Sequence, residues 1–284
     1  MTSQPSRAVL ITGCSTGIGR ATAVRLAQAG YPVYASARTL QTIADLAARG
    51  CKPVQLDVCD EASISAAIRG IEEDHGAVGV LINNAGYGSE GPFEEVAMDE
   101  VRLQFETNVF GLIRLTQLVL PGMRRQGWGK IVNMSSMGGR VAFPGGSFYH
   151  ATKFALEALS DSLRFEVRGF GIDVIIVEPG AIKTAFGDTA VARVDATARP
   201  GSPYDEFRQN LKDKIREAYD GPMALFAGEA DDVAKVVERA IAARRPRTRY
   251  PVTMGARFIL GLRRLLRDRG FDAFLATQFK APKA

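Results

Sequence analysis

The stretch ITGCSTGIGRA, residues 11–21, decides the fold, because its three glycines follow an apolar run and open a helical pattern. The run AVLIT at its start predicts a buried strand, and the apolar positions of residues 17–29 recur at helical spacing. Gly13, Gly17 and Gly19 allow a tight turn and a close approach of the backbone to a ligand. N–H groups at the start of a helix attract anions, so the loop predicts a phosphate-binding site.

The alternation of strand and helix patterns continues along the chain. Short apolar runs rich in β-branched residues predict further strands at 32–37, 53–58, 78–85, 130–136, 173–179 and 248–253. These runs are apolar on both faces, which is typical of a parallel sheet covered by helices on each side. No repeat or linker divides the chain. The sequence therefore predicts an α/β fold, a Rossmann-like doubly wound parallel sheet that spans residues 1–284 as a single domain.

Two segments depart from this alternation. Residues 185–228 are polar, punctuated by Gly and Pro, and only weakly helical around 204–219. Residues 255–284 form an amphipathic C-terminal extension beyond the last predicted strand. Ligands of such sheets bind beyond the carboxyl ends of the strands, so we assign a substrate lid to residues 185–228.

Composition excludes several classes of protein. With 46% hydrophobic and 24% charged residues, the chain has the composition of a soluble globular protein. No apolar run approaches the roughly 20 residues that span a bilayer, and the N-terminus lacks a secretory pattern. The three cysteines show neither even pairing nor metal-ligand spacing, which predicts a cytoplasmic protein without a metal site. The net charge of +5 accompanies no nucleic-acid-binding motif, so we expect no nucleic-acid partner.

The hexapeptide FYHATK (148–153) places a tyrosine and a lysine four residues apart, on one face of a predicted helix. Taken alone, the pair is more typical of an ordinary amphipathic helix than of a catalytic site, because Y-x-x-x-K is common by chance. Polar motifs at the ends of the predicted strands change this interpretation.

NNAG (83–86) ends the fourth predicted strand, MSS (134–136) ends the fifth, and EPGAIKT (178–184) ends the sixth. The first loop has the spacing T-G-x-x-x-G-x-G, and Asn108 lies in the helix after the fourth strand. With these motifs and the tyrosine–lysine pair, the chain resembles the short-chain dehydrogenase/reductase family over residues 12–184. Within that family it looks most like the steroid- and retinol-dehydrogenase-type members.

The resemblance implies catalytic roles for Ser136, Tyr149, Lys153 and Asn108. Reduction of a carbonyl leaves negative charge on oxygen, so an acid must stand near that atom. We expect Tyr149 to donate the proton in reduction and accept it in oxidation, with its pKa lowered by Lys153 and the oxidised nicotinamide. Ser136 is expected to orient the substrate oxygen, and Asn108 to anchor a water relay behind the lysine. His150 faces about 100° away from its neighbour on the helix, and we expect it to take no part.

The resemblance also implies a dinucleotide cofactor. The residues expected to bind it are Gly13, Ser15, Thr16, Gly17, Ile18, Gly19, Arg38, Asp57, Val58, Asn84, Ala85, Gly86, Tyr149, Lys153, Pro179, Gly180, Ile182 and Thr184. A carboxylate at the end of the second strand repels a 2′-phosphate, whereas an arginine there binds it. VYASARTL (33–40) lacks a carboxylate and places Arg38 just beyond the strand, which favours NADP(H) over NAD(H). A solvated surface arginine is the alternative.

Apolar residues near the predicted site favour a lipophilic ketone, aldehyde or alcohol as substrate. They are Val141, Phe143, Pro144, Phe186, Tyr204, Phe207, Met223, Leu225 and Phe226. Such residues equally often form ordinary core.

The C-terminal segment 256–279 opposes leucine and phenylalanine to arginine, as an amphipathic helix does. It either covers the substrate site, packs on another subunit, or lies on an anionic membrane surface. Packing within the protein or the oligomer is the favoured interpretation, and peripheral membrane contact is less favoured. The family resemblance implies a homodimer or homotetramer formed through the long central helices.

These patterns predict an NADP(H)-dependent oxidoreductase that interconverts a carbonyl and an alcohol. An epimerase or dehydratase of the same family is one alternative, but such relatives have T-G-x-x-G-x-x-G, which the glycines here do not match. A non-catalytic nucleotide-sensing or scaffold protein on the same fold is the other. A scaffold is expected to have lost a catalytic residue, whereas Ser136, Tyr149 and Lys153 are all present.

Overall fold

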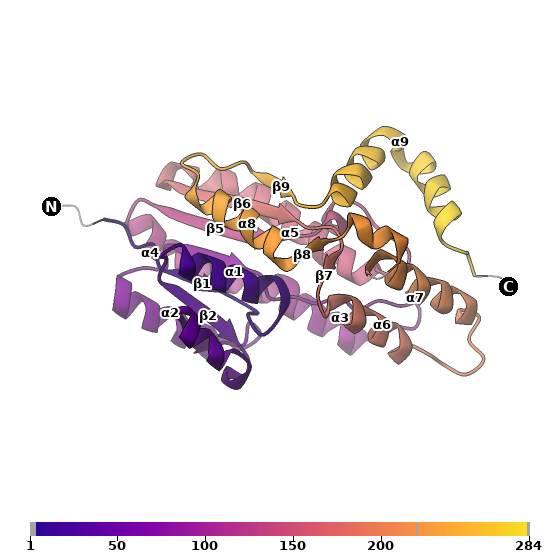
Figure 1. The fold of residues 1–284 in the computed structure, drawn as a ribbon, viewed down its shortest axis with the longest axis horizontal. Coiled ribbons are helices and arrows are strands. Elements are labelled where there is room, and N and C mark those ends of the chain that lie inside the picture. The colour runs from indigo at the N-terminus through magenta and orange to yellow at the C-terminus, as the bar shows by residue number, and fades with distance from the viewer. Residues whose placement is uncertain (1–3, 220, 283–284) are drawn as a thin grey trace.

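The structure is a computed structural model that describes residues 4–219 and 221–282, without the side chains of residues 222 and 223. Within these ranges a parallel sheet of seven strands has the order β3-β2-β1-β4-β5-β6-β9 (Figure 1). The strands are β1 (Val9–Ile11), β2 (Val33–Ala37), β3 (Cys51–Gln55), β4 (Val80–Asn83), β5 (Gly129–Met134), β6 (Ile172–Glu178) and β9 (Arg249–Pro251). This is the predicted doubly wound fold, with its switch point between β1 and β4.

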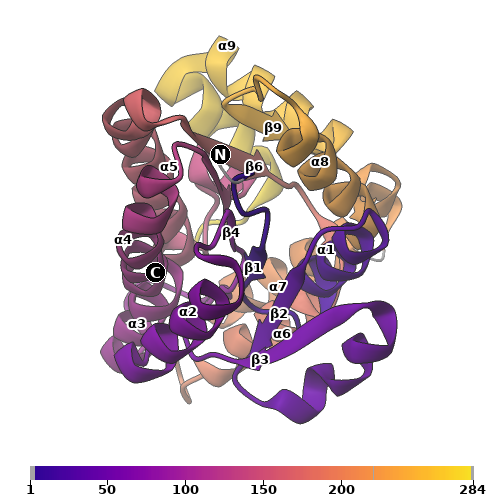
Figure 2. The ribbon, with the colours of Figure 1, turned by 90° about the vertical axis from the view of Figure 1, so that its left-hand side faces the viewer.

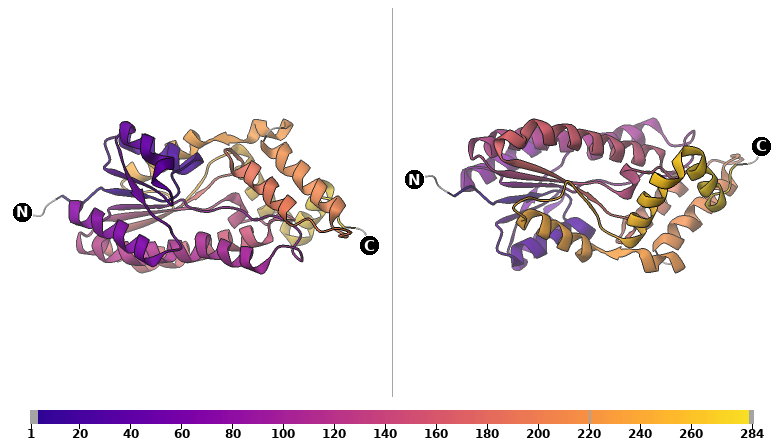
Figure 3. Two further views of the ribbon diagram at one scale, coloured as in Figure 1. Left: turned by 90° about the horizontal axis from the view of Figure 1, so that it is seen from below. Right: turned by 90° about the horizontal axis from the view of Figure 1, so that it is seen from above.

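Helices cover both faces of the sheet (Figures 2 and 3). One face carries α1 (Gly17–Gln28), the 3₁₀ segment η1 (Leu40–Arg49) and α8 (Ala230–Ala242). The other carries α2 (Glu61–His75), α4 (Gly111–Arg125) and α5 (Ser147–Val167). α3 (Met98–Phe105) and the π-helical segment η2 (Glu106–Phe110) lead into α4, and the short 3₁₀ turns are η3 (Met137–Gly139) and η4 (Arg168–Phe170).

The strand β1 shows why the apolar runs lack a polar face. Val9 and Ile11 join the core beneath α1 and α8, while Leu10 joins the core beneath α2 and α4. Successive side chains of a strand point to opposite faces, and here both faces are buried. Ile11 pairs with Ile82 of β4 in the parallel register, so the loops that leave these two strands begin at the same edge.

The strand boundaries differ from the predictions by a few residues, most clearly at β3. β3 ends before the predicted segment 53–58 does, because the chain turns at Asp57, whose carbonyl accepts a hydrogen bond from Asp60 N (3.1 Å). Residues 40–49 form a 3₁₀ helix, which is held to the core by buried Ile43 and Leu46.

The predicted lid contains two helices, of which the sequence analysis found only one. α7 (Asp205–Tyr219) matches the weak pattern at 204–219, but α6 (Phe186–Ala196) was not predicted. After Phe186, the first turn of α6 contains Gly187, Asp188 and Thr189, which have low helix propensity, and the helix packs against α7 rather than the sheet. The short strands β7 (Ile182–Lys183) and β8 (Gly228–Glu229) pair at the base of the lid, and the 3₁₀ segment η5 (Pro222–Phe226) precedes β8.

The lid is fastened to the segment that follows β4. The buried guanidinium of Arg208 in α7 forms an ion pair with the buried carboxylate of Glu95. The Tyr204 hydroxyl donates to Glu94 Oε2 (2.9 Å), and Arg193 of α6 pairs with Glu100 of α3 (2.6 Å). Removing either partner of a buried ion pair is strongly destabilising, so these contacts hold the lid in place.

The C-terminal extension is the helix α9 (Met254–Gln278), which bends at Arg267 (φ 54°, ψ −170°). Figure 1 shows its two arms, and the second arm reaches α7, where Lys280 N donates to Asn210 Oδ1 (3.1 Å). Residues 283–284 of the predicted extension lie outside the described residues. Among the helices of the described chain, none is long and apolar enough to cross a membrane.

Candidate active site

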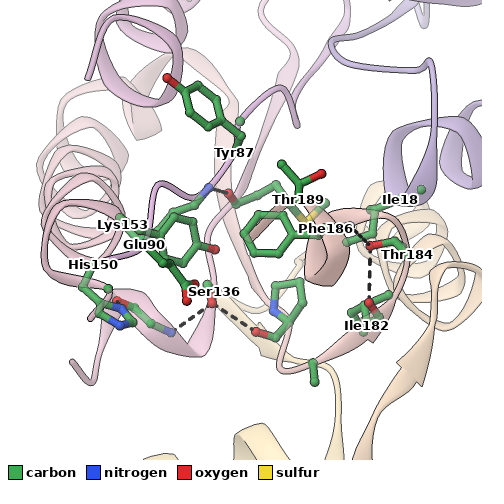
Figure 4. A pocket seen from close by; sticks show the side chains of 18 of the residues that line it. Ile18, Tyr87, Glu90, Ser136, His150, Lys153, Ile182, Thr184, Phe186 and Thr189 are labelled. Carbon is green, nitrogen blue, oxygen red and sulfur yellow. Dashed lines mark hydrogen bonds between the residues drawn. The ribbon is translucent and has the colours of Figure 1, made fainter. Parts of the chain in front are cut away.

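The residues predicted for the site converge on one large cavity at the carboxyl ends of the strands. Its volume is about 790 Å³, and the lid and the second arm of α9 contribute to its wall. Every predicted cofactor-binding or catalytic residue lines it except Gly19 and Asn108, which are buried beside it. In the close-up of Figure 4, Lys153 lies at one end of the cavity and Thr184 at the other.

Glycines shape the first loop of the cavity. Gly13 and Gly17 have φ values of 72° and 57°, in the left-handed region that favours glycine. A Cβ on Gly19 would lie 2.4 Å from Nδ2 of Asn84, so only glycine fits there. α1 starts at Gly17 without a side-chain cap from Thr16, which leaves its first N–H groups available to an anion. This cradle fits the phosphates of a dinucleotide.

Thr12, which the sequence analysis passed over as a site residue, joins this loop to the end of β4. Its hydroxyl accepts hydrogen bonds from Asn84 N (3.0 Å) and Ala85 N (2.9 Å). In return, Asn84 Nδ2 donates to the carbonyls of Thr12 (2.8 Å) and Gly13 (3.1 Å). The threonine that opens the glycine motif was the available signal. Asn84 therefore ties the end of β4 to the first loop, and its contact with a cofactor stays a prediction.

Arg38 and Asp57 lie where a dinucleotide's adenosine end is expected. Arg38 is exposed directly after β2, lines the cavity, and has no acidic neighbour at the end of that strand. Asp57 follows β3 and accepts a hydrogen bond from Cys59 N (3.0 Å) through Oδ1. The local charge at the end of β2 is thus positive.

Ser136, Tyr149 and Lys153 meet at the junction of β5 and α5. The Lys153 ammonium lies 5.7 Å from the centre of the Tyr149 ring and donates to the carbonyl of Met134 (2.9 Å). Ser136 follows β5, and its Oγ accepts a hydrogen bond from Gly138 N (3.0 Å). The structure therefore brings Ser136, which follows β5, together with Tyr149 and Lys153 of α5.

Burial governs the protonation of this group. It raises the pKa of Tyr149 to about 12, against a lowering effect of the Ser136 hydroxyl. It lowers the pKa of Lys153 to about 8, although Glu157 opposes the change. The sequence analysis expects Lys153 and the oxidised nicotinamide to lower the pKa of Tyr149; in the protein alone, burial raises it. Tyr149 is therefore protonated at neutral pH, the state that can donate to a carbonyl oxygen.

Asn108 lies behind the cavity wall, in the π-helical segment η2. Its Nδ2 donates to the carbonyl of Tyr87 (2.9 Å) and to Thr152 Oγ1 (3.1 Å), and its Oδ1 accepts from Tyr87 N (3.1 Å). A Cβ on Gly86 would lie 3.0 Å from that Oδ1 and 3.6 Å from Lys153 Nζ. Asn108 thus fixes the backbone next to the lysine, and its role in a water relay stays a prediction.

His150 and Ser135 border the same group. The His150 ring is buried, its Nδ1 lies 2.9 Å from the carbonyl of Gly138, and burial lowers its pKa, so the ring is neutral. The Ser135 hydroxyl lies against Gly139, where a Cβ would meet it at 2.6 Å. Both residues line the cavity, but the polar atoms named here lie against Gly138 and Gly139 of the η3 turn.

The predicted apolar rim is correct in part. Phe143, Pro144 and Phe186 line the cavity. The residues that were wrongly assigned to the rim are Val141, Tyr204, Phe207, Leu225 and Phe226. Leu225, for example, is 85% exposed, whereas Val141 is buried in the core. The side chain of Met223 lies outside the described residues.

Two further parts of the wall were not predicted as site residues. Glu90 lies in the loop after β4 and lines the cavity; no motif marks it. Phe274 and Leu275 line it from the second arm of α9, Phe279 from just beyond the end of that helix, and Ile259 from the first arm. For these the amphipathic pattern was a signal, because covering the site was one of its three interpretations.

Comparison with known proteins identifies relatives of this arrangement. The family model for short chain dehydrogenase matches residues 7–195. The chain is 35% identical to the uncharacterized oxidoreductase YbbO of Escherichia coli K12, over 95% of this chain and 94% of that protein. It is 38% identical to the 17-beta-hydroxysteroid dehydrogenase type 1 of Homo sapiens (92% and 81%). It is 37% identical to the retinol dehydrogenase 8 of Bos taurus (84% and 79%).

Solved structures of the same fold include cofactor complexes. A short-chain dehydrogenase from Streptomyces avermitilis has a TM-score of 0.78 and 33% identity, over 96% of this chain and 95% of that one. A short-chain dehydrogenase/reductase from Burkholderia phymatum in complex with NAD has 0.77 and 26% (100% and 99%). The closed form of a serine dehydrogenase complexed with NADP⁺ has 0.75 and 25% (87% and 94%).

Proposed function

Because the chain belongs to the short-chain dehydrogenase/reductase family, we propose that it is an oxidoreductase that uses NADP(H) to interconvert a carbonyl and an alcohol. In this proposal the substrate is a lipophilic small molecule and Tyr149 is the general acid and base. One observation carries it: Ser136, Tyr149 and Lys153 share a single cavity with the glycine loop. A proton donor beside a dinucleotide cradle is what carbonyl reduction requires.

The side chains divide the work as follows. Tyr149, protonated at neutral pH, donates its proton to the carbonyl oxygen in reduction and takes one from the alcohol in oxidation. The Ser136 hydroxyl donates a hydrogen bond to that oxygen and fixes its direction. Lys153 supplies positive charge close to the phenol, which stabilises the phenolate that reduction leaves. The bound nicotinamide supplies or accepts the hydride.

The cofactor class is supported by the fold's relatives, which bind NAD or NADP⁺. For NADP(H) in particular, the support is Arg38. It lines the cavity directly after β2, where a 2′-phosphate would meet its guanidinium, and no carboxylate stands at the strand end to repel the phosphate.

The substrate end of the cavity supports a lipophilic compound. Its wall includes Phe143, Pro144, Phe186, Leu211 and Ile215. Apolar walls with few polar groups bind apolar ligands by removing surface from water. Relatives named for a hydroxysteroid and for retinol agree with this choice.

We also propose a cytoplasmic homodimer or homotetramer. The cysteines of the described chain are unpaired, as in a reducing compartment. Large apolar side chains such as Phe154 and Phe165 are exposed on α5, one of the long central helices.

A panel of lipophilic ketones, aldehydes and alcohols with NADPH or NADP⁺ tests the proposal through the absorbance of the reduced cofactor. We expect turnover, and we expect Tyr149→Phe to lower kcat by about 10²- to 10⁴-fold, the usual contribution of a general acid. Cofactor binding should persist in Tyr149→Phe, and Tyr31→Phe, outside the cavity, should behave as the wild type.

Three results would contradict the proposal. Full turnover by Tyr149→Phe would remove the tyrosine from the mechanism. Cofactor binding without turnover on any substrate would favour a nucleotide-sensing or scaffold protein. Conversion of substrate without net change in the cofactor would favour an epimerase or dehydratase.

A further inference from the structure

One carboxyl group in the cavity has no part in the proposed chemistry. Glu90 lies in the loop after β4 and lines the cavity, and in Figure 4 it appears beside Lys153, His150 and Ser136. Within residues 4–219 and 221–282, no hydrogen bond or ion pair reaches its carboxyl group, and burial alone perturbs it. Its side chain is partly exposed to the cavity. A carboxyl group in a mostly apolar wall, with no partner among the described residues, is available to a ligand.

The loop around Glu90 is fixed on both sides. Ser89 Oγ donates to Glu100 Oε1 (2.6 Å), and Gly91 N donates to the carbonyl of Gly145 (2.8 Å). A Cβ on Gly88 would lie 3.0 Å from the Phe186 ring, so the loop also packs closely against the lid. Glu90 is therefore held in the cavity wall by its neighbours.

The basic side chains of the substrate end are engaged elsewhere. Lys153 donates to the carbonyl of Met134 (2.9 Å). Arg193 pairs with Glu100 (2.6 Å), and Lys214 pairs with Glu217 (2.8 Å). Among the described residues of the substrate end, no basic side chain is thus paired with Glu90. The wall around Glu90 is mostly apolar.

Glu90 also lies close to the reacting group. A Cβ on Gly88, two residues before Glu90, would lie 3.6 Å from Tyr149 Cδ2, so the loop that carries Glu90 passes beside the phenol. Burial raises the pKa of Glu90 itself to about 7, so a large fraction is ionised at neutral pH. A group of the substrate that meets Glu90 must therefore lie near the carbonyl that meets Tyr149.

We propose that Glu90 binds a hydrogen-bond donor of the substrate, an ammonium or hydroxyl group carried on a carbon close to the reacting carbonyl. The inference rests on the proposed function and narrows its substrate class to lipophilic carbonyl compounds with such a donor. A hydrogen bond to a carboxylate is charge-assisted, and a mostly apolar wall strengthens it.

Calorimetric titration with three ketones of one carbon skeleton tests this, with NADP⁺ present. One ketone is unsubstituted, one carries an amino group next to the carbonyl, and one carries a hydroxyl group there. The proteins are the wild type, Glu90→Gln, Glu90→Leu and, as a control, Glu73→Gln, which changes an exposed carboxylate on α2. Thermal unfolding of each variant shows that it is folded.

We expect the wild type and Glu73→Gln to bind at least one substituted ketone about 10-fold or more tighter than the plain one. Glu90→Leu should lose this preference. Glu90→Gln distinguishes the two donors, because its amide oxygen still accepts from a hydroxyl but has no charge for an ammonium.

The inference fails if the wild type binds the three ketones equally or binds none, or if Glu90→Leu keeps the preference. The outcome for the proposed function is separate, because calorimetry needs no turnover. A preference that depends on Glu90 without reduction of any ketone by NADPH supports the Glu90 site and refutes the oxidoreductase.

Discussion

Tyr149 keeps its proton at neutral pH, and this gives the two reaction directions different pH profiles. Reduction needs the phenol, whereas oxidation needs the phenolate, which is scarce below the pKa of about 12. We expect kcat/KM for alcohol oxidation to rise with pH by up to tenfold per unit, while kcat/KM for reduction stays level. The rise should weaken above about pH 8, where Lys153 loses its charge. An oxidation rate that does not change between about pH 6 and 8 would contradict this.

Arg38 is the residue on which cofactor choice depends. Arg38→Asp replaces attraction for a 2′-phosphate by repulsion, so kcat/KM with NADPH should fall by about 10- to 100-fold while kcat/KM with NADH is maintained or rises. Arg69→Asp, on the exposed side of α2, provides the same change of charge away from the cavity. Equal losses in the two variants, or an unchanged preference in Arg38→Asp, would assign Arg38 to the solvated surface.

Among single residues of the site, the sequence predicts those that belong to a motif and misses those that only the fold brings to the cavity. Tyr149 and Lys153 belong to a pattern with fixed spacing, and both line the cavity. Glu90 belongs to no pattern, and its relation to Tyr149 depends on the path of a loop. Burial raises the pKa of Tyr149 in the protein without its cofactor, and sequence does not show the extent of burial; the lowering expected from Lys153 and the oxidised nicotinamide stays a prediction.

The helix α9 differs along its length, and its two arms allow a matched comparison. Phe279, beyond its end, lines the cavity, while Phe258 in the first arm is 66% exposed. If the tail covers the substrate, Phe279→Ala should raise KM for lipophilic substrates about tenfold, because buried apolar contact is lost, and Phe258→Ala should not. If instead Phe258→Ala alone reduces co-sedimentation with anionic liposomes, the result supports peripheral membrane contact through α9.

The elements themselves were predictable where they pack on the sheet. The strands β1, β4, β5 and β6 come from β-branched runs that are buried on both faces, so periodicity and composition agree there, whereas the edge strands β3 and β9 are partly exposed. α6 was missed because it contacts mainly α7, and a helix with only three buried residues shows little amphipathic pattern. The bend of α9 at Arg267 has no glycine or proline to announce it.

The assembly of whole molecules should use the exposed apolar side chains of the central helices. Phe110 is 52% exposed and Phe154 is 46% exposed, on η2 and α5. We expect a dimer or tetramer by light scattering, and we expect Phe110→Glu with Phe154→Glu to produce monomers, because two charges would be buried without partners. Phe258→Glu is the comparison: dissociation by that variant alone would place the interface on α9.

For the molecule as a whole, the order of motifs along the chain was sufficient to predict the sheet and the edge where ligands bind. The parallel register then aligns those motifs, as the pairing of Ile11 with Ile82 shows. The closure of the cavity was not predictable, since it depends on pairs such as Arg208 and Glu95 that are distant in sequence.

That closure shares its anchor with Glu90. Glu94 and Glu95, which hold the lid through Tyr204 and Arg208, follow Glu90 in the same short segment. A substrate bound to Glu90 would therefore contact the same segment of backbone that carries the lid contacts of Glu94 and Glu95. Substrate specificity and the rate of substrate release therefore depend on one segment, so an insertion there would change both.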